Sequence, residues 1–196
     1  MRKLAMPAMS IAALALAACG GATASKTEAT SPESPAQAMS ANNSADALSV
    51  PGALFDKPSG WTFGEPSSSM RLAEASIPGA EGPALLTVFF FGQGGGGGTE
   101  ANLQRWAGQI EAAPGTEPTR GAFDVNGYSV STIAVEGILQ PSRMGGGPTE
   151  PTPGSKLIGA VVEGPGGPWF FKITGPAATV SAAEPAFDAM LRSVRP

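Results

Sequence analysis

Residues 121–136, GAFDVNGYSVSTIAVE, read as two β-strands joined by a tight turn. Asn126 and Gly127 form the pair favoured in a type I′ turn, whose two central residues both need a positive φ. The flanking segments, Gly121–Val125 and Tyr128–Glu136, are rich in β-branched and aromatic residues, as strands usually are. This stretch therefore predicts a β-hairpin and, with it, an antiparallel sheet.

Two further hairpins are predicted on either side of this one. Glycine and proline at 164–168 separate Lys156–Glu163 from Trp169–Thr174, and the turn-rich segment 78–83 separates Met70–Ile77 from Ala84–Phe91. Three hairpins predict a mainly antiparallel sheet of about six strands. Trp61 and Phe63 indicate a short additional strand at the edge of this sheet.

Two amphipathic helices are predicted, and each needs the sheet to cover its apolar stripe. The first follows the glycine run, with Thr99 as its cap and Pro114 beyond its end; its stripe is Leu103, Trp106, Ala107 and Ile110. The second covers about Val180 to Val194, with Ser181 and Glu184 at capping-box spacing. The predicted class is α+β, with a central sheet between two helices in an α/β/α sandwich.

The first nineteen residues resemble a bacterial lipoprotein signal peptide. Arg2 and Lys3 precede an apolar run, Leu4–Ala18, that is too short to span a bilayer permanently. Leu16-Ala17-Ala18-Cys19 then matches a lipobox, and Cys19 is the only cysteine of the chain. The resemblance implies that the chain is cut before Cys19 and that this residue carries acyl chains (palmitate among them) as a membrane anchor. The alternative is an ordinary secretory peptide with an unrelated cysteine.

These features predict three parts: a signal peptide over 1–18, a lipidated Cys19 with a disordered tether over 19–50, and one globular domain over 51–196. The tether is predicted because residues from Gly20 to about Ser49 include almost no large apolar side chain, and such a segment cannot offset its ordering entropy. Gly20 favours the outer membrane, facing the periplasm, over the inner membrane.

A resemblance to the domains of PsbP and Mog-type proteins covers most of 51–196. It depends on Gly60-Trp61, on Ser69-Met70-Arg71, on Phe91-Gly92 leading to Asn102–Trp106 with Gln109, and on Phe170–Pro176 before the last helix. The resemblance implies an α/β/α sandwich in an exported bacterial protein. PsbP relatives are extrinsic photosystem II subunits and Mog-type proteins bind a small GTPase, but the shared motifs are structural, so no functional residue is transferred.

Composition excludes several kinds of chemistry. The chain has no histidine, which rules out histidine-based triads and imidazole acid–base steps. Between 51 and 196 there are 9 basic and 13 acidic residues, a net charge of −4 without a basic run, so nucleic acid is a poor partner. No carboxylates have metal-ligand spacing. A paired-carboxylate hydrolase would need distant acids, such as Glu74, Glu136 and Glu163, to converge. We therefore expect no catalytic residue, metal or cofactor.

One candidate ligand site remains. The glycines from Gly94 to Gly98 precede a helix and could hold an anion on backbone N–H groups, with Gly95 and Gly98 as the expected contacts. Asn102, Arg105 and Lys172 would complete a polar pocket. The alternatives are a plain connecting loop, an Asn102 that satisfies loop backbone groups, a solvated Arg105, and a Lys172 stem that covers apolar sheet.

Two other features have functional and structural interpretations. The aromatic residues Trp106, Trp169, Phe170 and Phe171 could form a ligand box, but their periodic placement favours core packing. Residues 140–155 form a long loop rich in glycine and proline, which favours mobility over function.

The sequence thus predicts a lipid-anchored accessory or binding protein of the cell envelope, without catalysis, that works through contacts with another protein. The alternative is a small-ligand or anion-binding protein, or an enzyme, that uses the Gly94–Gly98 loop.

Overall fold

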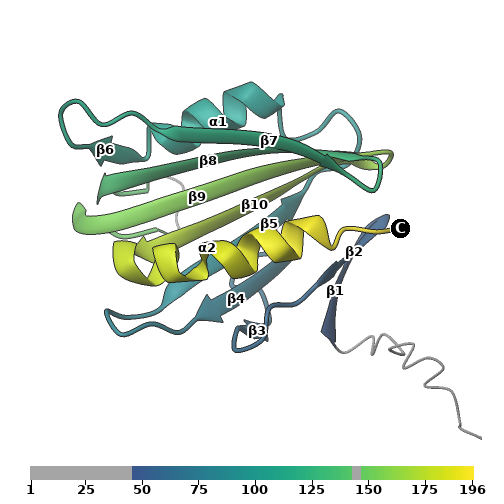
Figure 1. Cartoon of the computed structure of the whole chain (residues 1–196), viewed down its shortest axis with the longest axis horizontal. Coiled ribbons are helices and arrows are strands. Elements are labelled where there is room, and N and C mark those ends of the chain that lie inside the picture. Colours follow the sequence, from purple (N-terminus) through teal and green to yellow (C-terminus); the bar gives the residue numbers. More distant parts are fainter. Residues whose placement is uncertain (1–45, 143–146) are drawn as a thin grey trace, which may run out of the picture. The chain divides into compact units, whose positions relative to one another are not determined.

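The computed structural model describes residues 46–142 and 147–196, which lie in the compact unit Ala41–Pro196 (Figure 1). The strands are β1 Ala47–Val50, β2 Ala53–Asp56, β3 Thr62–Gly64, β4 Ala73–Ile77, β5 Ala84–Phe90, β6 Ile110–Ala112, β7 Thr119–Val125, β8 Tyr128–Leu139, β9 Thr152–Gly164 and β10 Gly167–Pro176. The helices are α1 Thr99–Ala107 and α2 Ala177–Arg192. The predicted signal peptide, Cys19 and most of the predicted tether lie outside the described residues.

The main sheet has eight strands in the order β3-β4-β5-β10-β9-β8-β6, with β7 also paired to β8, and every pairing is antiparallel. All three predicted hairpins are confirmed. Asn126 and Gly127 have φ values of 51° and 84°, as the predicted turn requires. The predicted count of about six strands is too low, because β3 and β6, three residues each, also pair with the sheet. The predicted edge strand is β3, which contains Phe63 and begins directly after Trp61.

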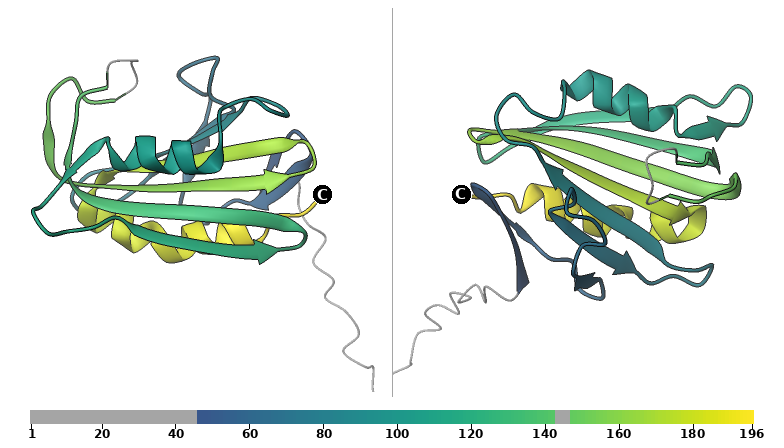
Figure 2. Two further views of the ribbon diagram at one scale, coloured as in Figure 1. Left: turned by 90° about the horizontal axis from the view of Figure 1, so that it is seen from above. Right: turned by 180° about the vertical axis from the view of Figure 1, so that it is seen from behind.

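The two helices lie on opposite faces of the main sheet, which confirms an α+β arrangement with a sheet between helices (Figure 2). Alternate residues of β10 show how this works: Phe171 packs in the core that α2 covers, whereas Phe170 packs in the core that α1 covers. In the second core, Trp106 of α1 lies against Gly159 of β9. A Cβ atom on Gly159 would be only 2.2 Å from Cε3 of that indole.

Helix α1 is shorter than predicted. It ends at Ala107, and Ile110 begins the strand β6, which pairs with β8. Ile110 is still buried in the same core as Trp106. It reaches this core from a strand, whereas its spacing from Trp106 had predicted a further turn of helix. Gly98, not Thr99, is the N-cap; the Thr99 hydroxyl instead donates to Glu163 Oε1 at 2.8 Å.

Helix α2 begins earlier than predicted, at Ala177, directly after Pro176 at the end of β10. Ser181 and Glu184 therefore lie inside the helix, and the predicted capping box is wrong. Both side chains contact Lys156 of β9, whose Nζ donates to Ser181 Oγ at 2.9 Å and forms an ion pair with Glu184.

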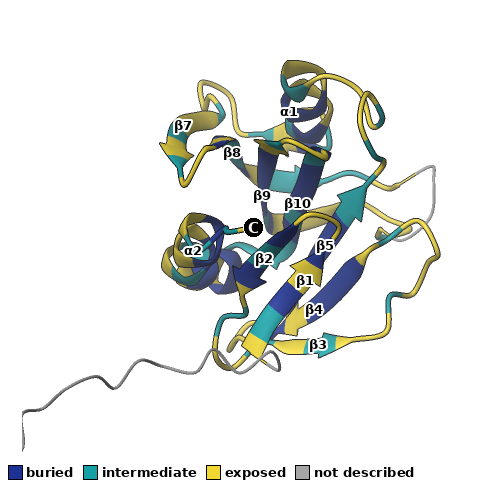
Figure 3. Cartoon of the chain, turned by 90° about the vertical axis from the view of Figure 1, so that its right-hand side faces the viewer, coloured by how far each residue is buried: buried dark blue, intermediate teal, exposed yellow. Residues whose placement is uncertain are grey.

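The ordered domain also begins earlier than residue 51. Strand β1 occupies positions that we predicted as tether, and Leu48 and Val50 are buried with Phe55 of β2 (Figure 3). Leu48 and Val50 have mostly polar neighbours in the sequence, but they form an ordered strand because β2 pairs with it. The predicted loop over 140–155 is also too long at its C-terminal end. Strand β9 begins at Thr152, so residues 152–155 are strand and not loop.

The β1–β2 hairpin is joined to the last residues of the chain. Leu54 and Arg195 exchange backbone hydrogen bonds of 2.7 and 3.1 Å. The Ser193 hydroxyl accepts from the Asp56 N–H at 2.8 Å, and the Arg195 guanidinium lies 2.7 Å from the Asp56 carboxylate. We call this set of contacts the terminal clasp.

Candidate functional site

Helix α1 covers only part of its face of the sheet, because it packs on β8 and β9 (Figure 3). Beside the helix, the same face of β10, β5 and β4 carries the half-buried Lys172, Leu85 and Phe89 and the buried Thr87 and Glu74. We call this area the open face. Its centre is a row of three polar residues, Lys172 on β10, Thr87 on β5 and Glu74 on β4, which are direct partners in the sheet register. Their strand neighbours Phe171, Val88 and Ala75 point to the opposite core, so the row faces the α1 side.

Lys172 is the most perturbed group in this row. Its Nζ donates to the Gln109 side-chain oxygen at 3.2 Å, just beyond the end of α1. Burial lowers the pKa of Lys172 to about 8, and the positive charges of Arg71 and Arg105 contribute to the shift. The guanidinium groups of Arg71 and Arg105 are therefore close enough to Lys172 to act on its charge.

Glu74 is the negative group of the row, and it is only 8% exposed. Burial alone would raise the pKa of Glu74, but hydrogen bonds from the Ser67 backbone N–H and from Arg71 outweigh it, so that the pKa lies below its usual value. The carboxylate is thus ionised at neutral pH and is already paired with Arg71.

The side chain of Asn102 holds the glycine loop through two backbone carbonyl groups. The Asn102 Nδ2 group donates to the carbonyl oxygens of Gly96 and Gly98 at 2.9 and 3.0 Å, and the side chain is buried. The Gly95 N–H donates to Gly92 O at 3.2 Å, so it already has a backbone acceptor. The structural interpretation of Asn102 is therefore the one that the contacts support.

The other predicted site residues fall into two groups. Arg105 donates to the Asn102 side-chain oxygen, and its charge acts on Lys172, so Asn102, Arg105 and Lys172 do form one polar neighbourhood. Gly98 touches this neighbourhood through Asn102, whereas Gly95 packs against Phe91. The prediction omitted Arg71, Glu74, Thr87 and Gln109. Only the single acidic residue in the apolar strand around Glu74 was a visible signal.

Aromatic side chains border the open face where β5 ends. The rings of Phe89 and Phe91 stack with centroids 6.2 Å apart, and Phe91 lies 5.9 Å from Phe170. Phe91 is 47% exposed, and Met70, in the segment before β4, is 60% exposed. Large apolar side chains are therefore available to a partner here.

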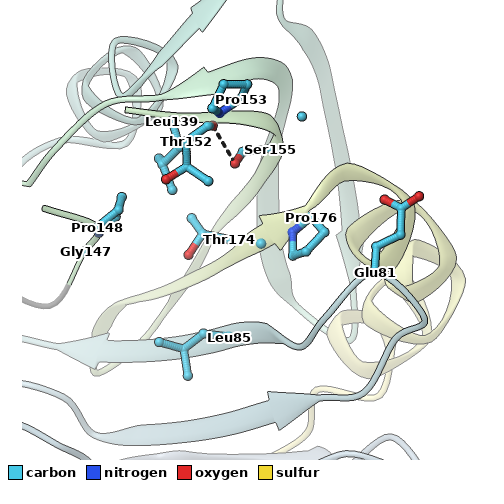
Figure 4. Close-up of a pocket in the computed structure, with 12 residues that line it drawn as sticks. Glu81, Leu85, Leu139, Gly147, Pro148, Thr152, Pro153, Ser155, Thr174 and Pro176 are labelled. Atoms are coloured by element: carbon cyan, nitrogen blue, oxygen red, sulfur yellow. Dashed lines mark hydrogen bonds between the residues drawn. The ribbon is translucent and has the colours of Figure 1, made fainter. Parts of the chain in front are cut away.

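A cavity of about 560 Å³ lies at the other end of the open face (Figure 4). Leu85 and Thr174, partners across β5 and β10, line it, and each is two residues along its strand from Thr87 or Lys172. Its other lining residues are Glu81, Leu139, Gly147, Pro148, Thr152, Pro153, Gly154, Ser155, Gly175 and Pro176. The cavity thus begins next to the polar row.

The four aromatic residues considered as a ligand box belong to two different cores. Trp106 and Phe170 pack on the α1 side of the sheet, and Trp169 and Phe171 pack on the α2 side. All four are at most 3% exposed. The predicted core packing is confirmed.

Within residues 46–142 and 147–196, acidic and other metal-ligating side chains do not gather in groups of three or more. In the same ranges, no helix has both the length and the apolar character needed to cross a bilayer. Comparison of the chain with models of protein families gives no match, and comparison with curated proteins gives no relative.

Proposed function

We propose that this protein is a lipid-anchored binding module of the bacterial envelope and that it binds its partner on the open face. The observation that carries the proposal is the half-buried Lys172, set among Arg71 and Arg105 in a domain whose net charge is negative. Burying a charged amine beside two like charges is unfavourable, and perturbed groups of this kind cluster at functional sites.

The side chains of the open face suit binding. Lys172, Arg105 and Gln109 offer hydrogen-bond donors, and the neighbouring Phe91 and Leu85 offer apolar contact. The donors lie on β10, which has residues in both cores, and on or next to α1, which packs on the sheet. Their backbone positions are therefore fixed before a partner arrives. The alternative of a ligand on the Gly94–Gly98 loop has weaker support, because the Gly95 N–H already donates to Gly92 O. A PsbP- or Mog-like form of the sandwich, in an exported bacterial protein, is part of the proposal.

Binding on the open face is tested by a photo-crosslinking residue at position 91 in the full chain, expressed in cells. We expect an adduct, seen as a mass shift, from position 91. A matched position is Ala182, which is exposed on α2 on the opposite side of the sheet. Equal adducts from both positions, or none from position 91, would contradict binding on the open face.

The anchor is tested by Cys19→Ala. Because Cys19 is the sole cysteine, we expect this variant to lack the acyl mass on residue 19, whereas the mature unsubstituted chain carries it. Mass spectrometry of the mature protein should show an acylated residue 19 at its start. A mature unsubstituted protein without acyl chains on residue 19 would refute the anchor.

A further inference from the structure

The charges around the polar row do not balance. Arg71, Arg105 and Lys172 contribute three positive charges, and the carboxylate that lies among them, Glu74, is paired with Arg71. Among the described residues, the contacts of the other two cations are neutral amide oxygens: Gln109 Oε1 for Lys172 and Asn102 Oδ1 for Arg105. An anion bound beside Lys172 and Arg105 would supply the missing charge, and charge-assisted hydrogen bonds are stronger than those to amides.

The adjoining cavity is mostly apolar. Leu85, Leu139 and three prolines contribute to its wall, and its volume of about 560 Å³ is in the range of small-molecule sites. Its nearest floor residue, Thr174, is about 7 Å along β10 from Lys172, given a rise of about 3.3 Å per residue. A single small molecule can therefore place a charged group at Lys172 and an apolar part in the cavity.

The orientation of such a molecule follows from the charges. Glu81 is the acidic residue of the cavity lining, and Figure 4 shows its carboxylate beside Pro176, away from Leu139 and Thr152. A second anionic group near Glu81 would be repelled. The negative end of the molecule is thus favoured at Lys172 and its apolar part in the cavity.

We propose that the open face binds an amphiphilic anion, with its carboxylate or phosphate head between Lys172 and Arg105 and its apolar body in the cavity at Leu85 and Thr174. This proposal rests on the proposed function and names its ligand class. The head could belong to a fatty acid or to an alkyl phosphate, and the two share the same recognition chemistry.

The test uses residues 20–196, which keep the whole compact unit and omit the apolar run and Cys19, so that no detergent is needed. This protein is titrated by calorimetry with decanoate and decyl phosphate. We expect saturable binding of one or both. Decanol, which lacks the charge, and acetate and inorganic phosphate, which lack the apolar body, should bind at least tenfold more weakly. Binding near pH 8 should also take up protons, because an anion stabilises the charged form of Lys172.

The variants Lys172→Met and Arg105→Ala should each weaken decanoate binding at least tenfold. Matched controls are Lys156→Met, which removes a lysine that pairs with α2 on the other face, and Arg120→Ala, which removes an exposed arginine paired with Glu100. Both controls should bind as the parent does. Circular dichroism verifies that each variant is folded.

Three outcomes would overturn the inference: neither amphiphile binds, decanol binds as well as decanoate, or Lys172→Met binds as well as the parent. If no amphiphile binds but position 91 still gives a specific crosslink, this inference fails and the proposed function stands. If both experiments fail, both proposals fail.

Discussion

Replacement of Trp106 by alanine is expected to lower the free energy of unfolding by about 3–5 kcal/mol. Trp106 is 3% exposed and is the largest residue that joins α1 to the sheet. Its ring lies on Gly159, where the sheet has no side chain to replace it, so truncation leaves a cavity. Urea unfolding followed by circular dichroism measures the loss.

The partner of this contact gives a second, opposite perturbation. Gly159→Ala places a methyl group 2.2 Å from the Trp106 ring, and overpacking of this kind costs about 1–3 kcal/mol. In the double variant the new methyl group occupies space that the indole has vacated. The loss of unfolding free energy in the double variant should therefore be smaller than the sum of the two single losses, by about 0.5–3 kcal/mol. Additive losses would show that Trp106 does not seat on Gly159.

Lys172→Met is expected to stabilise the protein at pH 7 by about 1–3 kcal/mol. The pKa of Lys172 is about 8 in the folded protein, and its ordinary value, which applies to the unfolded chain, is 10.5. Between pH 8 and pH 10.5 the unfolded chain therefore binds one more proton than the folded protein. The penalty for the buried charge is fully present below pH 8 and disappears as the pH rises to about 10.5. The lost hydrogen bond to Gln109 reduces the gain by about 1 kcal/mol.

The measurement is the difference in unfolding free energy between parent and variant at several pH values from 7 to 10.5. We expect this difference to shrink as the pH rises. Lys156→Met serves as the control, because Lys156 pairs with Glu184 and its removal should destabilise the protein. A Lys172→Met protein that is less stable than the parent at pH 7 would mean that the charged amine is not under strain. A stabilising loss of Lys172 would instead agree with a site kept for function at a cost in stability.

Local signals predicted the hairpins well and the ends of elements poorly. Asn126 and Gly127 determine their turn by their own φ preferences, which neighbours in space hardly alter. Ile110 has the correct spacing for α1, but its burial is achieved equally by β6, and the choice depends on a pairing with β8 that is distant in sequence. Leu48 and Val50 likewise become strand residues only because β2 is available.

The sequence placed Asn102, Arg105 and Lys172 in one polar neighbourhood, but it did not predict the other members of the polar row. Asn102 and Arg105 are three residues apart on α1, so their contact follows from helical geometry. Lys172, Thr87 and Glu74 become neighbours through the register of three strands, and one-residue slips would separate their side chains onto opposite faces. The imbalance of charge around Lys172 could therefore not be read from composition.

The terminal clasp has a mechanical consequence. Tension that enters through the residues before β1 reaches the β1–β2 hairpin first, and that hairpin is bridged to Arg195. A bead or optical handle attached after Pro196 would pull on the same small hairpin, so stretching between the two ends would load the clasp before the eight-stranded sheet. The clasp should accordingly rupture at the lowest force, while the open face keeps its shape.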